Sequence, residues 1–167
     1  YRWSIHYTNS VSSDDVTITN NEPDKANGGP RTRTICGDTH TMEGNIPLVG
    51  TAKWIILSGG GSFVDDTNPN TVVTNLAKGW NKFKFEINYK GCPSVDTVSV
   101  LNDLPDQAYA GEDDVVCDSK YELKPNNPTH GVGEWRVVEG SAKFEGNFAT
   151  NLAQGRNVLA WVVQGST

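Results

Sequence analysis

Internal repeats limit the possible folds of this chain more than any other feature of its sequence. The stretch NLAKGWNKFKFEI at 75–87 returns as NLAQGRNVLAWVV at 151–163. GTAKWIILSGGGSF at 50–63 aligns without a gap on GVGEWRVVEGSAKF at 131–144. A unit of about 80 residues that recurs along a chain predicts an array of similar domains rather than one large fold.

Both ends of the chain align with the same unit. Residues 1–18 align on 83–100, and the Pro-Asp-x-Ala-x-x-Gly pattern of 22–29 returns at 104–111. A proline there suits a linker, because it has no N–H to donate to a sheet ladder. No initiator methionine or signal peptide precedes the strand-like start, so we expect a piece of a longer protein. We predict three domains: the C-terminal strands of a preceding repeat at 1–20, a complete repeat at 21–102, and a repeat lacking its last strand at 103–167.

Strand-like segments separated by turn residues fill the complete repeat. No stripe of helical period occurs, and glycine is frequent, with 17 residues. In NKFKFEINY, apolar side chains alternate with polar ones, which is typical of a strand with one face in the core. The pattern predicts an all-β fold of tandem immunoglobulin-like β-sandwich domains. The expected strands lie at 31–36, 39–43, 52–58, 62–64, 71–75, 81–89 and 95–101.

Four aromatic residues are the predicted core of the two larger repeats. Trp54 aligns with Trp135, and Phe85 aligns with Trp161. Trp54 lies in Lys-Trp-Ile-Ile-Leu and resembles the core tryptophan of a central sandwich strand. The residues around Asn75 and Gly79 are kept in both copies, and we interpret them as turn and corner residues rather than as a site.

The chain has three cysteines, an odd number, and we expect them to form disulfides. Cys36 and Cys92 are the only pair in the complete repeat, and a bridge between them would stabilise the domain by roughly 4 kcal/mol. Cys117 aligns with Cys36, and its partner position falls just beyond the chain end. A reactive thiol at Cys117 is the alternative, but its neighbours supply no activating base or cation. We therefore predict a Cys36–Cys92 disulfide, a Cys117 bridge to a cysteine beyond residue 167, and an oxidising, extracellular setting.

Charge and motifs exclude several classes of function. The net charge of −6 argues against nucleic acid as a partner, because phosphate binding needs clustered Lys and Arg. No apolar run approaches the length of a membrane span. The three histidines stand apart from one another without metal-ligand spacing, and no nucleophile motif or dinucleotide fingerprint stands in a suitable context. We therefore expect no enzyme activity.

Acidic residues near the second domain boundary are the one candidate for a metal site. Clustered carboxylates between tandem β domains supply the oxygen ligands that Ca²⁺ prefers. A solvated acidic linker is the alternative, and the first boundary favours it, because basic residues stand there instead. No other cofactor is expected. The possible calcium ligands are Asp103, Asp106, Asp113 and Asp114.

Trp80 is the one candidate for a ligand contact. It falls on the polar side of its strand's alternation, where a tryptophan is expected to be exposed. Its equivalent in the next repeat is Arg156, so a sugar-binding platform shared by all repeats is not expected. Packing against a neighbouring domain is the alternative role of this side chain.

One pattern of residues runs through the complete repeat: Cys36, Trp54, Gly59, Phe63, TNLAKGWNKFKFEI at 74–87, and Gly91-Cys92. This pattern resembles the tandem Ig-like/PKD-like repeats of very large cell-surface proteins of Bacteroidota. These include gliding-motility adhesins and other cargo of the type IX secretion system. The resemblance covers the whole chain and has no catalytic residues to transfer. It implies PKD-like sandwich domains, an extracellular location on a bacterial surface, and an adhesive or filament-forming role.

Two functions follow as expectations. The first is a non-catalytic spacer or structural array in a large surface adhesin or filament, with neighbouring repeats and other copies as partners. The second is an accessory module of a secreted enzyme, which binds carbohydrate or protein through an exposed aromatic side chain. If the chain were otherwise complete, the two ends of neighbouring molecules would be able to complete each other by β-strand addition. The alternative, which we favour, is that the ends only mark where a longer protein was cut.

Overall fold

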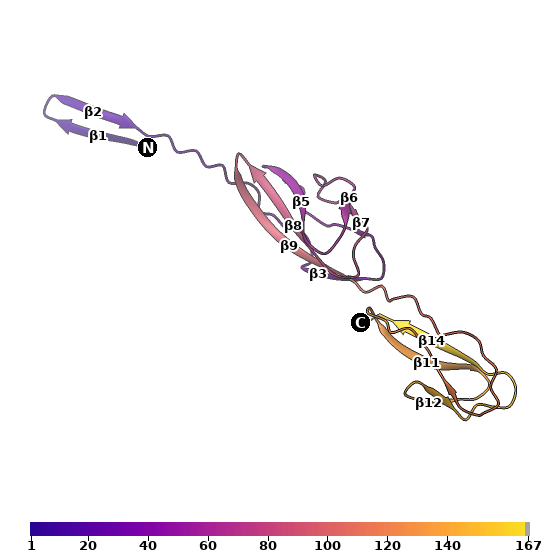
Figure 1. The fold of residues 1–167 in the computed structure, drawn as a ribbon. Helices are drawn as coiled ribbons and strands as arrows, with labels where there is room; N and C mark the ends of the chain where they lie inside the picture. The colour runs from indigo at the N-terminus through magenta and orange to yellow at the C-terminus, as the bar shows by residue number, and fades with distance from the viewer. Residues whose placement is uncertain (166–167) are drawn as a thin grey trace.

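The computed structural model describes residues 1–165 and shows three groups of strands in a row (Figure 1). The prediction of an all-β chain is confirmed, since this part of the chain contains no helix. Residues 1–165 therefore contain no helix that is able to cross a membrane. The strands are β1 (Arg2–Tyr7), β2 (Ser10–Asp15), β3 (Thr32–Ile35), β4 (His40–Thr41), β5 (Thr51–Ser58), β6 (Ser62–Phe63), β7 (Val72–Thr74), β8 (Gly79–Tyr89), β9 (Cys92–Asn102), β10 (Tyr121–Glu122), β11 (Val132–Glu139), β12 (Lys143–Glu145), β13 (Phe148–Thr150) and β14 (Val158–Gln164).

The middle group, β3 to β9, is called the central unit. Its strands form one sheet in the order β3-β9-β8-β5 and another in the order β4-β7-β6. β8 pairs antiparallel with both β5 and β9, whereas β3 pairs parallel with β9. Each of the seven segments predicted for the complete repeat overlaps one of these strands. The arrangement is compatible with a β-sandwich.

One apolar core joins the two sheets of the central unit. The predicted core residues Trp54 and Phe85 are 1% and 0% exposed, and their ring centroids lie 4.6 Å apart. Phe63 comes from the other sheet, and its ring lies 5.6 Å from that of Phe83. Trp54 Nε1 donates a hydrogen bond of 2.9 Å to the carbonyl of Pro69, which satisfies the only polar group of that side chain.

The last group, β10 to β14, is called the C-terminal unit, and it repeats local details of the central unit. Trp54 lies opposite Phe85 in the β5–β8 ladder, and Trp135 lies opposite Trp161 in the β11–β14 ladder. Each ladder has a register shift at the aligned place, between Ile56 and Ser58 and between Val137 and Glu139. The stretches that align in sequence therefore adopt the same local structure, with the same irregularity.

The core of the C-terminal unit is more open than that of the central unit. Trp135 and Trp161, both predicted for the core, are only partly buried, and their ring centroids lie 5.1 Å apart. Within the described residues, β14 pairs with β11 alone, whereas the aligned β8 has a strand on each side. In the central unit, the second neighbour of β8 is β9, which supplies Val98 to the core.

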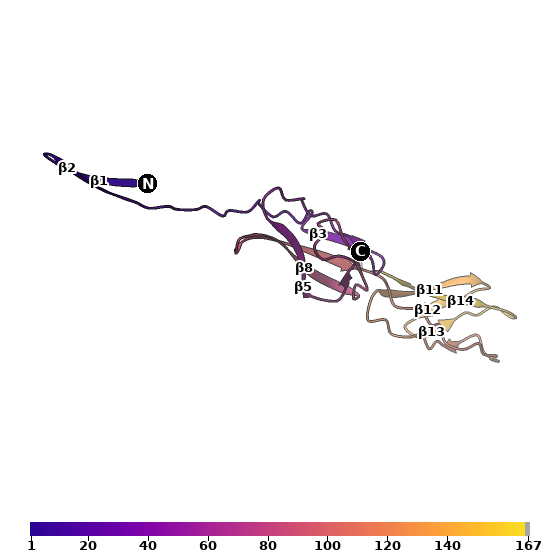
Figure 2. The same cartoon turned by 90° about the horizontal axis from the view of Figure 1, so that it is seen from above.

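The first group is a hairpin of β1 and β2, whose register matches that of β8 and β9. Tyr7 pairs with Ser10 in the hairpin, as Tyr89 pairs with Cys92 in the central unit. An ion pair between Arg2 and Asp15 lies on its surface. Figure 2 shows the hairpin and the C-terminal unit on opposite sides of the central unit.

The predicted Cys36–Cys92 disulfide is wrong. Both thiols are exposed and free, because they lie at opposite ends of the central unit. Cys36 directly follows Ile35, which pairs with Asn102 at the end of β9, whereas Cys92 begins β9. That strand has 11 residues at ~3.3 Å per residue, so the thiols lie roughly 30 Å apart, while a disulfide needs Cα atoms within about 7 Å. Cys117 is also free and exposed, and its proposed partner lies outside the described residues.

Candidate functional site

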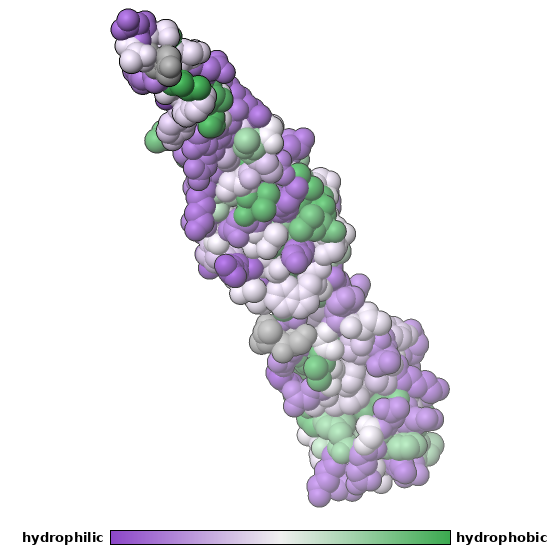
Figure 3. Space-filling model, turned by 90° about the vertical axis from the view of Figure 1, so that its left-hand side faces the viewer, coloured by the Kyte–Doolittle hydropathy of each residue, from purple (hydrophilic) through white to green (hydrophobic). Residues whose placement is uncertain are grey.

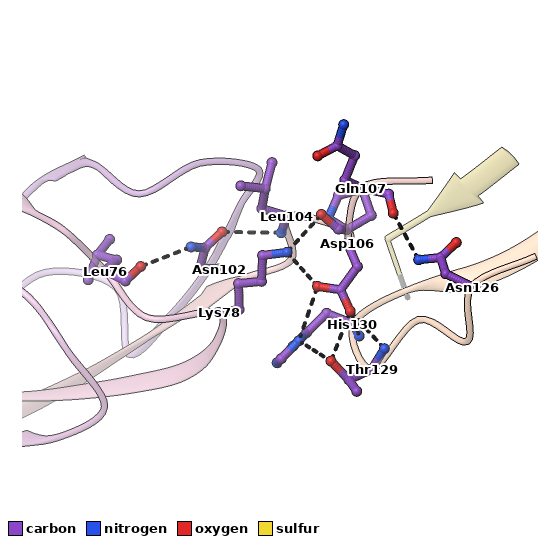
Figure 4. Close-up of polar contacts among 10 residues, drawn as sticks. Leu76, Lys78, Asn102, Leu104, Asp106, Gln107, Asn126, Thr129 and His130 are labelled. Atoms are coloured by element: carbon purple, nitrogen blue, oxygen red, sulfur yellow. Dashed lines mark hydrogen bonds and ion pairs between the residues drawn. The ribbon is translucent and has the colours of Figure 1, made fainter. Parts of the chain in front are cut away.

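Polar side chains gather where the central unit meets the C-terminal unit, and this cluster is called the joint (Figure 4). Lys78 comes from the loop between β7 and β8, and its Nζ donates to Asp106 Oδ1 at 2.6 Å. The same Nζ donates to the carbonyl oxygen of Pro105 at 3.0 Å. Both side chains of this ion pair are less than one-third exposed, at 31% and 24%. Lys78 therefore ties the central unit to the first residues of the C-terminal unit.

Asp106 is in turn bound firmly to the C-terminal unit. Its Oδ2 accepts hydrogen bonds from the backbone N–H and hydroxyl of Thr129, at 2.7 and 2.8 Å, and from the N–H of His130 at 3.0 Å. Its own N–H donates to the carbonyl of His130 at 2.8 Å. The ammonium of Lys78 and these N–H donors hold the pKa of Asp106 well below its usual range. The carboxylate is therefore ionised at physiological pH and links the two units.

Asn102 fixes the direction in which the chain leaves β9. This side chain is 2% exposed, and its Nδ2 donates to the carbonyl of Leu76 at 3.2 Å. Its Oδ1 accepts from the N–H groups of Leu104 at 3.1 Å and Gly37 at 3.3 Å. The backbone that enters the joint is therefore held by the loop that carries Lys78, because Leu76 belongs to that loop.

The loop that carries Lys78 owes its shape to the residues that both repeats keep. Asn75 and Gly79 adopt positive φ angles of 55° and 85°, which glycine and asparagine tolerate best. Asn81 is completely buried, and its Nδ2 donates to the carbonyls of Ala77 and Gly79 at 2.8 and 3.0 Å. Its Oδ1 accepts from Gly60 N–H at 2.8 Å. The bends on either side of Lys78 aim its side chain at the joint.

The aligned loop of the C-terminal unit has the same hydrogen bonds. Asn157 donates to the carbonyls of Ala153 and Gly155 and accepts from Ser141 N–H, which are the counterparts of the Asn81 contacts. Asn151 has a φ of 58°, as Asn75 has 55°. The interpretation of these residues as turn and corner residues agrees with this geometry. Gln154 replaces Lys78, so the second copy of the loop lacks the ammonium group.

Asp24 and Asp106 have the same role at the starts of their units. Asp24 Oδ2 accepts from the N–H groups of Leu48 and Val49 at 2.6 and 3.2 Å. These residues align with Thr129 and His130, the donors to Asp106. A carboxylate that accepts from two successive N–H groups closes a loop onto the incoming chain. The shared Pro-Asp pattern therefore marks the entry to each unit.

The four aspartates predicted as calcium ligands do not form a metal-binding cluster. No group of three or more His, Cys, Asp or Glu side chains in residues 1–165 is placed to hold a metal ion. Asp106 has protein donors on both oxygens, and Asp103 lies beside Gly165 at the joint. Asp113 and Asp114 lie instead along a shallow hollow with Tyr109 and Tyr121. The side chains share one stretch of sequence, but the structure spreads them over two places.

Trp80, the predicted ligand contact, is 58% exposed on β8, next to Gly79. Its cross-strand partner is Leu101, and Lys82 follows on the same face. The lysine is exposed, so the surface around the indole combines one aromatic ring with a positive charge. A single exposed ring offers one stacking contact, which is a small site for a saccharide.

The contacts of the joint link the two units to each other. Its charged groups face each other, and its N–H donors are bonded to carboxylate or carbonyl oxygens. Sequence reasoning missed Lys78, Asn102 and Thr129, because only the fold brings them to one place. Two signals in the sequence pointed to Asp106: the shared Pro-Asp pattern and the acidic residues of the second boundary. No known family model matches the chain, and no curated protein is significantly similar to it.

Proposed function

We propose that this chain is a non-catalytic part of a large extracellular surface protein, in which tandem immunoglobulin-like (PKD-like) units form an extended spacer. The observation that carries the proposal is the joint, where Lys78 and Asp106 couple two successive units. An array that presents a binding tip away from a cell must resist bending at its linkers, and the Lys78–Asp106 link supplies such resistance between the central and C-terminal units. Adhesins and filaments of the gliding-motility type are the class of protein that this role fits.

The recurrence of local structure supports the same proposal. Asn81 and Asn157, and likewise Asp24 and Asp106, form matching hydrogen bonds in successive units. In an array, each unit needs only its own core and a standard connection to the next. Repeated connections are therefore the expected design of a spacer.

The stiffness of the joint can be measured between two native thiols. Cys92 lies in the central unit and Cys117 in the C-terminal unit, and both are exposed, so spin labels attach to them in a Cys36→Ser background. We expect a narrow distribution of distances between the labels, which becomes broad in Lys78→Met. Lys82→Met is the matched control, because this exposed lysine lies in the following strand β8 and takes part in none of the joint's hydrogen bonds described above. Equal distributions in the two variants would contradict a role of Lys78 in coupling the units.

The surface location requires a separate experiment. An antibody against the chain is expected to label intact cells of the producing organism as strongly as permeabilised cells. Labelling only after permeabilisation would contradict an extracellular role, whatever the stiffness of the joint.

An accessory binding module is the second candidate function, and exposed Trp80 is the observation that favours it. Indole rings stack on saccharides through their apolar faces. A glycan array that detects binding by the chain, and loss of that binding in Trp80→Ala, would support this function. Loss of binding in Lys82→Ala but not in Trp80→Ala would indicate that charge attraction, and not stacking on the indole, holds the glycan.

A further inference from the structure

The outer edge of β5 in the central unit is covered by the loop of residues 65–71, which joins β6 to β7. The carbonyl of Asp66 accepts a hydrogen bond of 2.8 Å from the backbone N–H of Trp54. The carbonyl of Pro69 accepts another of 2.9 Å from the indole Nε1 of the same tryptophan. The loop therefore supplies main-chain acceptors to an edge of the sheet that no further strand pairs with.

The C-terminal unit lacks this loop. Its strands β12 and β13 are joined by Gly146 and Asn147 alone, and Gly146 has a φ of 60°, which suits a two-residue hairpin turn. The carbonyl of Asn147 accepts from Leu123 N–H at 2.7 Å, as the carbonyl of Thr71 accepts from Met42 N–H at 2.8 Å. The short turn therefore keeps the connection at the end of the loop and omits the part that covers the edge.

The outer edge of β11 has no such cover. Trp135 lies opposite Trp161 in the same register as Trp54 opposite Phe85, so the backbone N–H of Trp135 points away from β14. No carbonyl of residues 1–165 accepts from this N–H in the way that the carbonyl of Asp66 accepts in the central unit. β5 and β11 are both outermost strands of their sheets. The difference between the two edges therefore arises from the loop inside the chain and not from either chain end.

A hollow of about 450 Å³ lies beside β11, next to the short turn. The rings of Trp135 and Phe144 lie 6.1 Å apart, and those of Trp54 and Phe63 lie 6.2 Å apart, so the two tryptophans are placed alike. Trp54 is 1% exposed beside its loop, whereas Trp135 is only partly buried. The residues that line the hollow are Gly133, Glu134, Trp135, Phe144, Gly146, Asn147 and Trp161.

The strand β11 also exposes apolar side chains. Val137 and Val138 are 40% and 66% exposed. Apolar side chains are visible on the surface of the C-terminal unit, at the bottom of Figure 3. An edge strand with unpaired N–H groups and exposed apolar side chains is a template for pairing with another segment.

We propose that the outer edge of β11 binds an extended peptide segment of a partner protein, which lies beside β11 as the loop of residues 65–71 lies beside β5. A carbonyl of the segment accepts from the backbone N–H of Trp135, and a side chain of the segment enters the hollow. Main-chain hydrogen bonds at a sheet edge give affinity to such contacts, and pockets for side chains give specificity. The central unit contains the same contact within one chain. The proposal does not depend on the proposed function.

The charge at the edge indicates the kind of segment. In the central unit, the ammonium of Lys53 pairs with the carboxylate of Asp66 at 3.3 Å. Glu134 aligns with Lys53, so the charge beside β11 has the opposite sign. Glu134 is 64% exposed, and its ion pair with Arg136 is an exposed one, which contributes little. We therefore expect a lysine or arginine in the segment at the position that corresponds to Asp66.

A second substitution limits how closely the segment follows the loop. Gly44 N–H donates to the carbonyl of Pro69 at 3.0 Å, and a Cβ at Gly44 would lie 2.9 Å from that carbonyl oxygen. Pro125 aligns with Gly44, so the C-terminal unit has neither this N–H nor this space. We expect the segment to match the loop near Asp66 and to leave its path before Pro125.

The first test titrates the isotope-labelled chain of 167 residues with two capped peptides and records nuclear magnetic resonance spectra. One peptide has the sequence of residues 64–70, and the other has the same sequence with Asp66→Lys. We expect both to shift the backbone amide signal of Trp135. The lysine peptide should bind roughly threefold more tightly or better, because it replaces repulsion from Glu134 by an ion pair.

Trp54 is the internal control of this titration, because its own loop already occupies both of its N–H groups. Its signals are expected to stay in place. No shift of the Trp135 signal with either peptide, or equal shifts at the two tryptophans, overturns the proposal.

The second test reverses the charge of the edge. Glu134→Lys is expected to reverse the preference, so that the peptide with aspartate binds more tightly than the peptide with lysine. Glu139→Lys is the matched control, because it makes the same change of charge in an exposed side chain of β11, beyond the register shift. This control is expected to keep the preference of the parent chain. An unchanged preference in Glu134→Lys, or the same change in both variants, overturns the assignment of Glu134 as the contact.

Discussion

Replacement of Asn81 by alanine tests whether the kept asparagine holds the central unit together. Asn81 is completely buried, and it forms hydrogen bonds of 2.8, 2.8 and 3.0 Å to Gly60, Ala77 and Gly79. Three neutral hydrogen bonds contribute about 1 kcal/mol each, and the groups left without a partner in the interior add to this loss. We expect the free energy of unfolding of the central unit to fall by about 3–5 kcal/mol, a large part of what a domain of this size has.

Asn157→Ala is the matched comparison, because Asn157 forms the same bonds in a loop that is partly open to water. Water replaces some of the lost bonds there, so we expect a loss of about 1–2 kcal/mol. Hydrogen exchange in denaturant, read separately in β5 and β11, assigns each loss to its unit. A loss below about 1 kcal/mol for Asn81→Ala, or equal losses for the two variants, would refute this account of the loop.

Three further predictions follow from individual contacts. A thiol reagent should react without denaturant with all three cysteines, Cys36, Cys92 and Cys117. Oxidation should form disulfides between molecules rather than within one. A Cys36–Cys92 pair that is protected from the reagent would contradict the topology. Trp54→Phe should lower the free energy of unfolding of the central unit by about 1 kcal/mol or more, because the Pro69 carbonyl loses its donor. Trp161→Phe removes an N–H that has no partner among the described residues, so it should leave the C-terminal unit at least as stable. Chemical denaturation of both variants measures the two effects. The pKa of Asp106 is lowered in the folded protein, so the ionised carboxylate stabilises the joint fully above the usual aspartate pKa near 4. This contribution is lost only as the pH falls through the still lower pKa of the folded protein. The distribution of distances between labels on Cys92 and Cys117 should therefore stay narrow at pH 4, and a broader distribution there would contradict the Lys78 link.

The repeats allowed much of the fold to be predicted, because each strand carries its own signal. Alternation in NKFKFEINY identified β8, and the kept Asn75 and Gly79 identified a turn whose backbone angles few other residues adopt. Such features depend on neighbours along the chain. They are therefore visible without knowledge of what each strand packs against.

The wrong prediction, the Cys36–Cys92 disulfide, concerns residues that are related only through the fold. Cys36 and Cys92 are a pair by elimination in the sequence, yet the parallel pairing of β3 with β9 puts them at opposite ends of the unit. The fold likewise spreads the acidic residues of the second boundary over two places, with Asp106 at the joint and Asp113 and Asp114 along the hollow beside Tyr121. Spacing in the sequence does not measure distance across a sheet, because each strand carries the chain about 3.3 Å per residue.

The sequence by itself determined that the chain is built from strands, where their turns lie and which stretches share one local structure. These properties follow from the alternation of apolar residues and from the backbone angles of glycine and asparagine, which act over a few residues. Only the tertiary structure decided that Lys78 meets Asp106, that the cysteines stay apart and that β3 pairs parallel with β9. These properties depend on strand order and on packing between segments far apart in the chain, which no local pattern of residues specifies.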